Sequence, residues 1–180
     1  FQNNKGDFWH IYETRPYMTA CYQYLSVLMR NGFTTRAIKE GRSLLDLCKS
    51  DNLSVRYDLM HLFALVENKE KAEELFRDYR EEQTSQMMLP LCFLYYKIGD
   101  TEIAKNLLLK IKGLNKDLPK FIKMVLDESI YDEMADMLGK SYRPNTIEEL
   151  LSEYDRFYYI FESCPLFFTW AKTVLSKKNN

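Results

Sequence analysis

The sequence predicts an all-α protein, in which three stacked helical hairpins form a solenoid and a helical cap follows them. A small residue recurs at Ala37, Ala72 and Ala104, at intervals of 35 and 32 residues. A turn position stands five residues before each Ala, and a large apolar residue stands four residues before each turn. These turn positions are Gly32, Glu67 and Gly99, and the apolar residues are Leu28, Phe63 and Tyr95. Because apolar residues also follow each Ala at 3–4 spacing, each unit has an amphipathic second helix that only a stacked neighbour can cover.

Length and composition predict a single globular domain spanning residues 1–180. The chain has 46% apolar and 28% charged residues, which is enough to build a substantial core. A formal net charge of -1 lacks the basic excess of nucleic-acid-binding proteins, so no nucleic-acid partner is expected. The longest apolar run, 87–96, is about half of the length that a membrane span needs, and Pro90 interrupts it. We therefore expect no membrane partner.

Three segments follow one another along the chain. Residues 1–13 are expected to form an N-terminal arm or short helix, residues 14–113 the three hairpins, and residues 114–180 an irregular segment with capping helices. The hairpin helices are expected at about residues 15–30, 34–49, 54–66, 68–83, 85 to the turn at 99, and 100–112.

Side chains with oxygen acceptors stand where each of these helices begins. The predicted N-caps are Thr14, Thr34 or Thr35, Ser54, Asn68 and Asp100, and the third hairpin is expected to start at Ser85. Pro16 suits the first turn of its helix, and Gly32 suits a left-handed end. Pro90 removes one backbone hydrogen bond near the start of the fifth helix.

Beyond Gly113 the repeat period is lost, although helical patterning continues. A short helix is expected from Asp117 to about Asp127, and another between Asp132 and Leu138. Thr146 and Glu149 have the spacing of a capping box, which predicts a helix to about residue 161. Pro165 then opens a last helix, and these two aromatic helices are expected to close the open end of the solenoid.

Several short strings resemble a known family. They are Phe8-Trp9, Glu13-Thr14-Arg15-Pro16-Tyr17-Met18, the turn from Gly32 to Ala37, Asp51-Asn52 with Val55-Arg56-Tyr57, and Asn115 with Leu118-Pro119. The chain resembles a bacterial family of tetratricopeptide-repeat (TPR) proteins, which is similar in its repeats to the eukaryotic suppressor-of-tumorigenicity-seven group. This resemblance implies helical repeats and protein contacts, with no established reaction. The sequence departs from the usual repeat at Leu25 and Met60, where Gly or Ala is common, and at Lys49, Thr84 and Lys116, where Pro often ends the unit.

No residue pattern predicts an enzyme or a cofactor. The two histidines, His10 and His61, have no Ser, Cys, Asp or Glu at a motif spacing that announces a nucleophile and its base. The six glycines form no phosphate-binding loop. We therefore expect a non-catalytic protein that uses no metal or cofactor.

The four cysteines form no CxxC pair, and they are Cys21, Cys48, Cys92 and Cys164. This scatter favours buried thiols in a reducing compartment over disulfides or metal ligands, so a cytoplasmic location is expected. Because the chain begins at Phe1, we expect that a segment has been removed.

The first helices of the hairpins are expected to line a concave aromatic groove. The positions predicted to bind a partner are Tyr22, Gln23, Arg30, Tyr57, Asp58, His61, Phe93, Tyr96 and Lys97. In the favoured hypothesis the chain is an adaptor whose groove binds a peptide or partner helix. The alternative is a regulatory or assembly module that self-associates through its C-terminal helices or joins a complex by its outer surface. The oligomeric state is expected to be a monomer or weak homodimer, and Tyr22, Tyr57 and Phe93 have a second interpretation as packing residues between helices.

Overall fold

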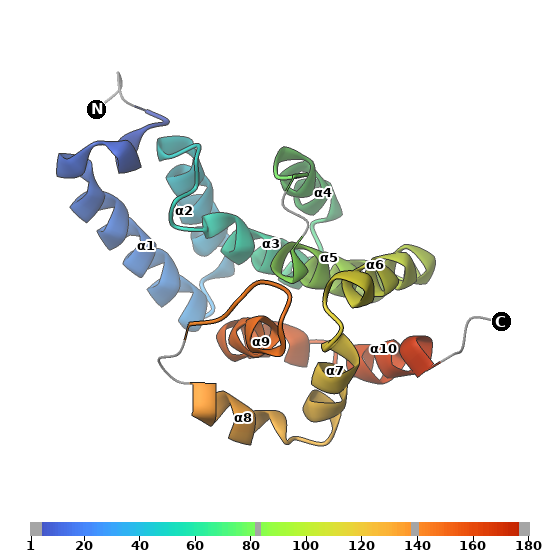
Figure 1. Cartoon of the computed structure of the whole chain (residues 1–180). Helices are drawn as coiled ribbons and strands as arrows, with labels where there is room; N and C mark the ends of the chain where they lie inside the picture. The colour runs from blue at the N-terminus through green and yellow to red at the C-terminus, as the bar shows by residue number, and fades with distance from the viewer. Residues whose placement is uncertain (1–4, 82–83, 138–140, 177–180) are drawn as a thin grey trace. The chain divides into compact units, whose positions relative to one another are not determined.

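The computed structural model describes residues 5–81, 84–137 and 141–176, and the predicted all-α class is confirmed within them. The α-helices of these ranges are α1 (Arg15–Arg30), α2 (Thr34–Leu47), α3 (Val55–Leu65), α4 (Lys69–Asp78), α5 (Ser85–Lys97), α6 (Thr101–Leu114), α7 (Leu118–Leu126), α8 (Ile130–Met137), α9 (Ile147–Glu162) and α10 (Leu166–Ser176) (Figure 1). The chain divides within α3 into two compact units, residues 1–63 and residues 64–180. Each unit is described by itself. None of the described helices has the length and apolar character needed to cross a membrane.

In the first unit, the segment before α1 folds back onto the end of α2. Its two 3-10 helices are η2 (Phe8–His10) and η3 (Tyr12–Thr14). The Gly6 amide donates to the Leu47 carbonyl, and the Gly6 carbonyl accepts from the Lys49 amide at 2.8 Å. Phe8 is buried, so this segment contributes to the core of the hairpin.

The turn between α1 and α2 has the geometry predicted for it. Gly32 adopts a φ of +72°, a left-handed conformation that costs a glycine little. The Gly32 and Phe33 amides donate to the Met29 and Leu28 carbonyls, which satisfies carbonyls at the end of α1. The next small residue, Ala37, is fully buried where α2 packs on α1.

The predicted N-caps are wrong for several helices. The Thr14 hydroxyl donates to the carbonyls of Ile11, at 2.9 Å, and of Phe8, so it caps no amide of α1. Thr34 is the first residue of α2 and does not precede it. The Asp100 carboxylate accepts from the Lys69 ammonium at 2.9 Å. Among these positions, only the Asn68 side chain accepts an amide of its own helix, from Lys71 at 3.1 Å.

In the first unit α2 also approaches α3 closely, at Gly41. A β-carbon added to Gly41 would lie 2.9 Å from Leu59 Cδ2 and 3.4 Å from Val55 Cγ1. Gly113 in α6 is also helical, but a β-carbon there would meet no atom within 4 Å. This helix was predicted to end at about residue 112, before Gly113, whereas α6 continues to Leu114.

These two glycines give matched substitutions with opposite expected effects. Gly41→Val should destabilise the protein by about 1–3 kcal/mol, because the larger side chain overpacks the contact with Leu59. Gly113→Ala should stabilise it by up to about 1 kcal/mol, because Ala loses less backbone entropy in a helix. Urea unfolding followed by circular dichroism measures both changes. A Gly41→Val protein as stable as the parent would contradict the close packing of α2 on α3.

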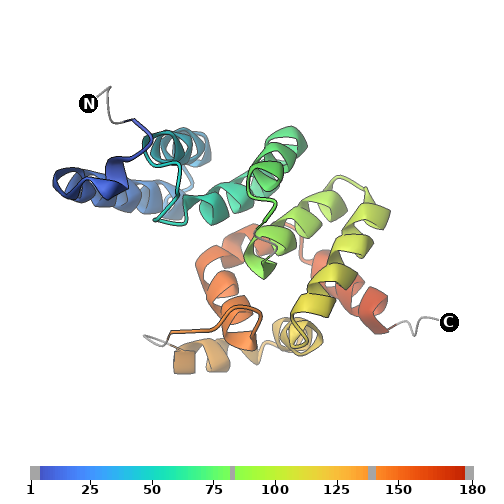
Figure 2. The same cartoon turned by 45° about the horizontal axis from the view of Figure 1, so that its top comes forward.

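The second unit is organised around the hairpin of α5 and α6, and Figure 2 shows the same hairpin from a second direction. α5 continues through Pro90, and every residue from Met87 to Tyr95 is buried. The Cys92 thiol donates to the Ala104 carbonyl at 3.1 Å, so the two helices meet closely at this small residue. α9 packs on α5 and α7, while α10 packs on α5, α6 and α7.

The predicted capping box at the start of α9 is wrong. The Thr146 hydroxyl donates to the Arg143 carbonyl at 2.8 Å instead of accepting from the helix. The Glu149 carboxylate accepts from the Asn145 amide at 2.9 Å and from the Ser85 hydroxyl at 3.0 Å. Glu149 therefore connects α9 to the first residue of α5.

Glu149 is buried, and this predicts a pH dependence of stability. Burial raises the pKa of Glu149, even though the Asn145 and Ser85 hydrogen bonds act in the opposite direction. A raised pKa in the folded state contributes stability below the unfolded-state pKa of about 4.3, and this contribution is lost as pH rises through the folded-state pKa. Glu149→Gln should therefore be more stable than the parent at pH 8, and the difference should shrink towards pH 4. Thermal melts at both pH values test this, and an unchanged difference would contradict it.

Candidate functional site

The predicted groove residues of α1 differ in their exposure. Tyr22 is half-buried, whereas Gln23 and Arg30 are exposed to solvent. No ion pair involves Arg30 in the described part of the chain. Two of the three predicted residues of this helix are therefore accessible to a partner.

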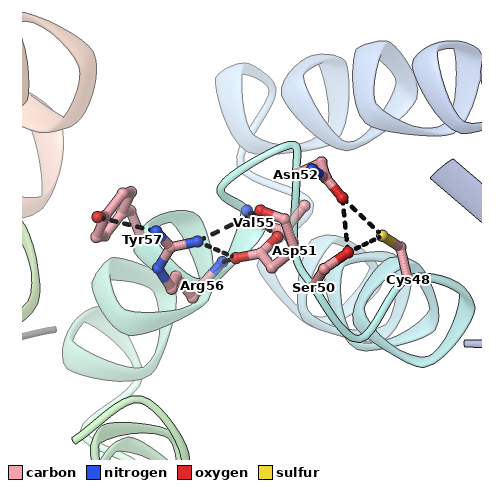
Figure 3. A network of polar contacts seen from close by, with 7 residues as sticks. All are labelled: Cys48, Ser50, Asp51, Asn52, Val55, Arg56 and Tyr57. Carbon is pink, nitrogen blue, oxygen red and sulfur yellow. Dashed lines mark hydrogen bonds and ion pairs between the residues drawn. The ribbon is translucent and has the colours of Figure 1, made fainter. Parts of the chain in front are cut away.

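Tyr57 lies at the end of a polar network in the first unit (Figure 3). The Asp51 carboxylate accepts from the Val55 and Arg56 amides at 2.7 and 3.0 Å, so it caps α3 in place of the predicted Ser54. Asp51 adopts a φ of +46°, which turns its side chain back towards the helix. The same carboxylate forms an ion pair with Arg56 at 2.7 Å.

Arg56 in turn holds the Tyr57 side chain. Its guanidinium donates to the Tyr57 hydroxyl at 3.1 Å and lies 4.4 Å from the centre of the ring. Burial raises the pKa of Asp51, and the Arg56 and Val55 hydrogen bonds oppose that shift. The residues that carried part of the family resemblance thus form a structural network, and Tyr57 belongs to it.

Asp58 and His61 are both fully buried in α3. His61 Nδ1 lies 2.8 Å from the Tyr57 carbonyl, one turn earlier in the same helix. Neither side chain is accessible to a peptide in this conformation.

In the second unit, the chain's own C-terminal helices pack on Phe93 and Tyr96, two of the three predicted groove residues of α5. Phe93 is fully buried, and its ring centre lies 5.4 Å from that of Phe161 and 5.2 Å from that of Phe167. Tyr96 is half-buried against Trp170 of α10, with 4.8 Å between the ring centres. Phe93 is therefore a packing residue between helices. Tyr96 and Trp170 are both only partly buried, so part of this aromatic pair is exposed to solvent.

Lys97 has a local structural role. Its ammonium donates to the Leu65 carbonyl at 3.1 Å and lies 3.3 Å from the Glu67 carboxylate. A cation at the last carbonyls of α3 offsets the negative end of the helix dipole. This side chain is only 10% exposed, so little of it faces solvent.

An exposed and uncharged face of α1 was not predicted from the sequence. We call the residues Tyr17, Ala20, Gln23, Tyr24 and Val27 the α1 surface, and of these only Gln23 was predicted to bind a partner. Tyr17, Tyr24 and Val27 are 47%, 41% and 53% exposed. A signal was present in the sequence, because no charged residue occurs between Arg15 and Arg30.

An arginine of α2 stands beside this surface. The Arg36 guanidinium donates to the Tyr24 hydroxyl at 2.6 Å and lies 5.8 Å from the centre of the Phe33 ring. Phe33 is itself 52% exposed in the turn. The α1 surface and these two residues combine exposed aromatic rings with a positive charge.

The hydrogen bonds around Ser50 do not prepare it as a nucleophile for His10. The fold brings Ser50 Oγ within 3.1 Å of His10 Nε2 and 3.2 Å of Cys48 Sγ, which the sequence spacing did not reveal. The Ser50 hydroxyl donates to Asn52 Oδ1 at 2.6 Å, so its single proton does not point at the imidazole (Figure 3). Within the described ranges, no three His, Cys, Asp or Glu side chains gather to hold a metal ion.

Comparison with known proteins found no relative: no family model, no curated protein and no solved structure matches the chain.

Proposed function

We propose that this chain is a non-catalytic interaction module of TPR-like helical hairpins, and that it binds a peptide or partner helix. The observation that carries this proposal is the α1 surface, which exposes two tyrosines and a valine on a helix face without charge. Contiguous apolar surface of this kind costs solubility and is characteristic of interaction sites.

The residue types support the same conclusion. Tyr and Arg are enriched at the centres of protein interfaces, where a few residues provide most of the binding energy. Tyr24 is held by Arg36, and Phe33 adjoins the same guanidinium. A side chain that is fixed before binding loses less entropy on binding, so this arrangement favours affinity.

The predicted groove contributes to this surface through α1. Gln23 belongs to the α1 surface, and Arg30 lies one helical turn beyond Val27, the last residue of this surface. Asp58, His61, Phe93 and Lys97 are assigned structural roles, because they are buried or hold backbone carbonyls. The proposal therefore moves the binding site from a groove along all three hairpins to the exposed side of the first hairpin.

The absence of catalysis is proposed on chemical grounds. Ser50 is the hydroxyl closest to an imidazole in the first unit's polar network, but its proton is donated to Asn52. A nucleophilic serine requires that proton to be directed at its base. This arrangement stabilises the loop between α2 and α3 and does not activate Ser50.

Self-association through the C-terminal helices receives less support. Phe161, Phe167 and Phe168, the aromatic residues that would drive it, are buried within the second unit. A light-scattering mass that stays monomeric over a wide concentration range is expected.

The experiment that tests the function compares partner capture by the parent chain and by a chain carrying Tyr24→Ser and Val27→Ser. Both side chains are about half exposed, so the double variant should melt within a few degrees of the parent. Proteins captured from a lysate of the source cells by the parent should bind this variant more weakly by at least about 2 kcal/mol in total. Tyr158→Ser is the control, because Tyr158 is 47% exposed in the second unit. Equal capture by the parent and the double variant would contradict the proposal.

A further inference from the structure

We infer that the partner of the α1 surface is an acidic amphipathic helix, with apolar side chains against Tyr17, Tyr24 and Val27 and a carboxylate on Arg36. This inference rests on the proposed function, and it adds the chemical class of the partner.

The apolar part of the surface has helical spacing. Tyr17, Ala20, Tyr24 and Val27 follow one another at intervals of 3 or 4, so they form one stripe along α1. The stripe is about 15 Å long, because a helix rises 1.5 Å per residue. A partner helix with apolar residues at i, i+3 or i+4, i+7, and i+10 or i+11 matches this length.

Arg36 supplies a site for an anionic side chain next to the stripe. Its guanidinium donates to the Tyr24 hydroxyl, and no carboxylate of the described residues forms an ion pair with it. Arginine has five N–H donors in a planar fork, so most of them stay available. A carboxylate accepts two of them in parallel, which gives both orientation and affinity.

The charged residues around the stripe are mostly basic. Arg30, Lys39 and Arg42 are exposed on α1 and α2, and within the described residues none of them forms an ion pair. Two acids lie on this hairpin: Asp46 is paired with Lys5 and Lys49, and the half-buried Glu40 interacts electrostatically with Tyr17 and Cys21 of α1. Complementary charge steers a partner and excludes one of like charge, so an acidic helix is favoured. A second copy of this basic hairpin would instead meet its own charge.

The test selects peptides without fixing their charge. A displayed library of five-turn peptides, about 18 residues long, carries Leu at 3–4 spacing and a random choice of Glu, Lys, Gln or Ala elsewhere. Selection is made on the parent chain. We expect the selected peptides to be rich in Glu and to bind at least tenfold more weakly to a chain with Arg36→Glu and Lys39→Glu. Lys110→Glu with Lys112→Glu, on the exposed side of α6, changes the net charge equally and should leave the affinity unchanged.

The possible outcomes distinguish the location of the binding surface from the acidic character of its partner. Selected peptides that are neutral or basic, but that still lose affinity to the Tyr24→Ser and Val27→Ser chain, would overturn the acidic partner and leave the binding surface standing. Selected peptides that bind this variant as well as the parent would overturn both. A library in which no peptide is enriched would also overturn both.

Discussion

Ala104→Asp is expected to unfold the second unit at temperatures where the parent is folded. Ala104 is fully buried where α6 packs on α5, and its carbonyl accepts the Cys92 thiol at 3.1 Å. A carboxylate at this position would be buried without a cationic partner, and its side chain has no space beside α5. The expected loss of unfolding free energy exceeds about 3 kcal/mol.

Ala135→Asp on α8 is the matched control, because Ala135 is exposed. This change should alter the free energy of unfolding by less than about 0.5 kcal/mol. Denaturant unfolding followed by circular dichroism measures both variants. If Ala104→Asp melted within a few degrees of the parent, the packing of α6 on α5 at this residue would be incorrect.

Asp51→Ala has the second of the two largest expected effects. The substitution removes the acceptor of two α3 amides and the ion-pair partner of Arg56, whose side chain is only 11% exposed. Because Arg56 would remain partly buried without this carboxylate, the expected cost is about 3–5 kcal/mol. The same measurement of unfolding in denaturant applies.

Asp46→Ala provides the comparison for Asp51→Ala. Asp46 forms its ion pairs with Lys5 and Lys49 at the surface, with 55% of its side chain exposed. Exposed ion pairs contribute about 0–1 kcal/mol, so this variant should be nearly as stable as the parent. Similar costs for the two substitutions would show that the Asp51 network does not stabilise α3.

Helical periodicity predicted most helices, because apolar 3–4 spacing and the turn residues are local signals. α1 coincides with its predicted range, and the three small residues that set the repeat are all fully buried. The predicted end of α4 was less accurate, since this helix ends at Asp78, and residues 82–83 of the predicted range lie outside the described residues. Helix ends depend on local alternatives for each side chain, as Thr14 and Thr146 show by donating to carbonyls.

The candidate site was harder to predict because its residues depend on contacts between distant segments. The burial of Phe93 comes from Phe161 and Phe167, which lie on helices about 70 residues further along the chain. The position of Phe93 within its repeat predicts that it lines an open groove, because the repeat pattern does not include the C-terminal helices. The α1 surface has a local signal in the sequence, because no charged residue occurs between Arg15 and Arg30.

Photo-crosslinking from the α1 surface tests the central claim most directly. A photoreactive phenylalanine derivative replaces Tyr24 in one chain and Tyr158 in another, since both tyrosines are about half exposed but belong to different units. We expect the chain labelled at position 24 to form a covalent adduct with its partner in a lysate of the source cells, and the chain labelled at 158 to form none. An adduct from position 158 alone, or from neither position, would contradict binding at the α1 surface.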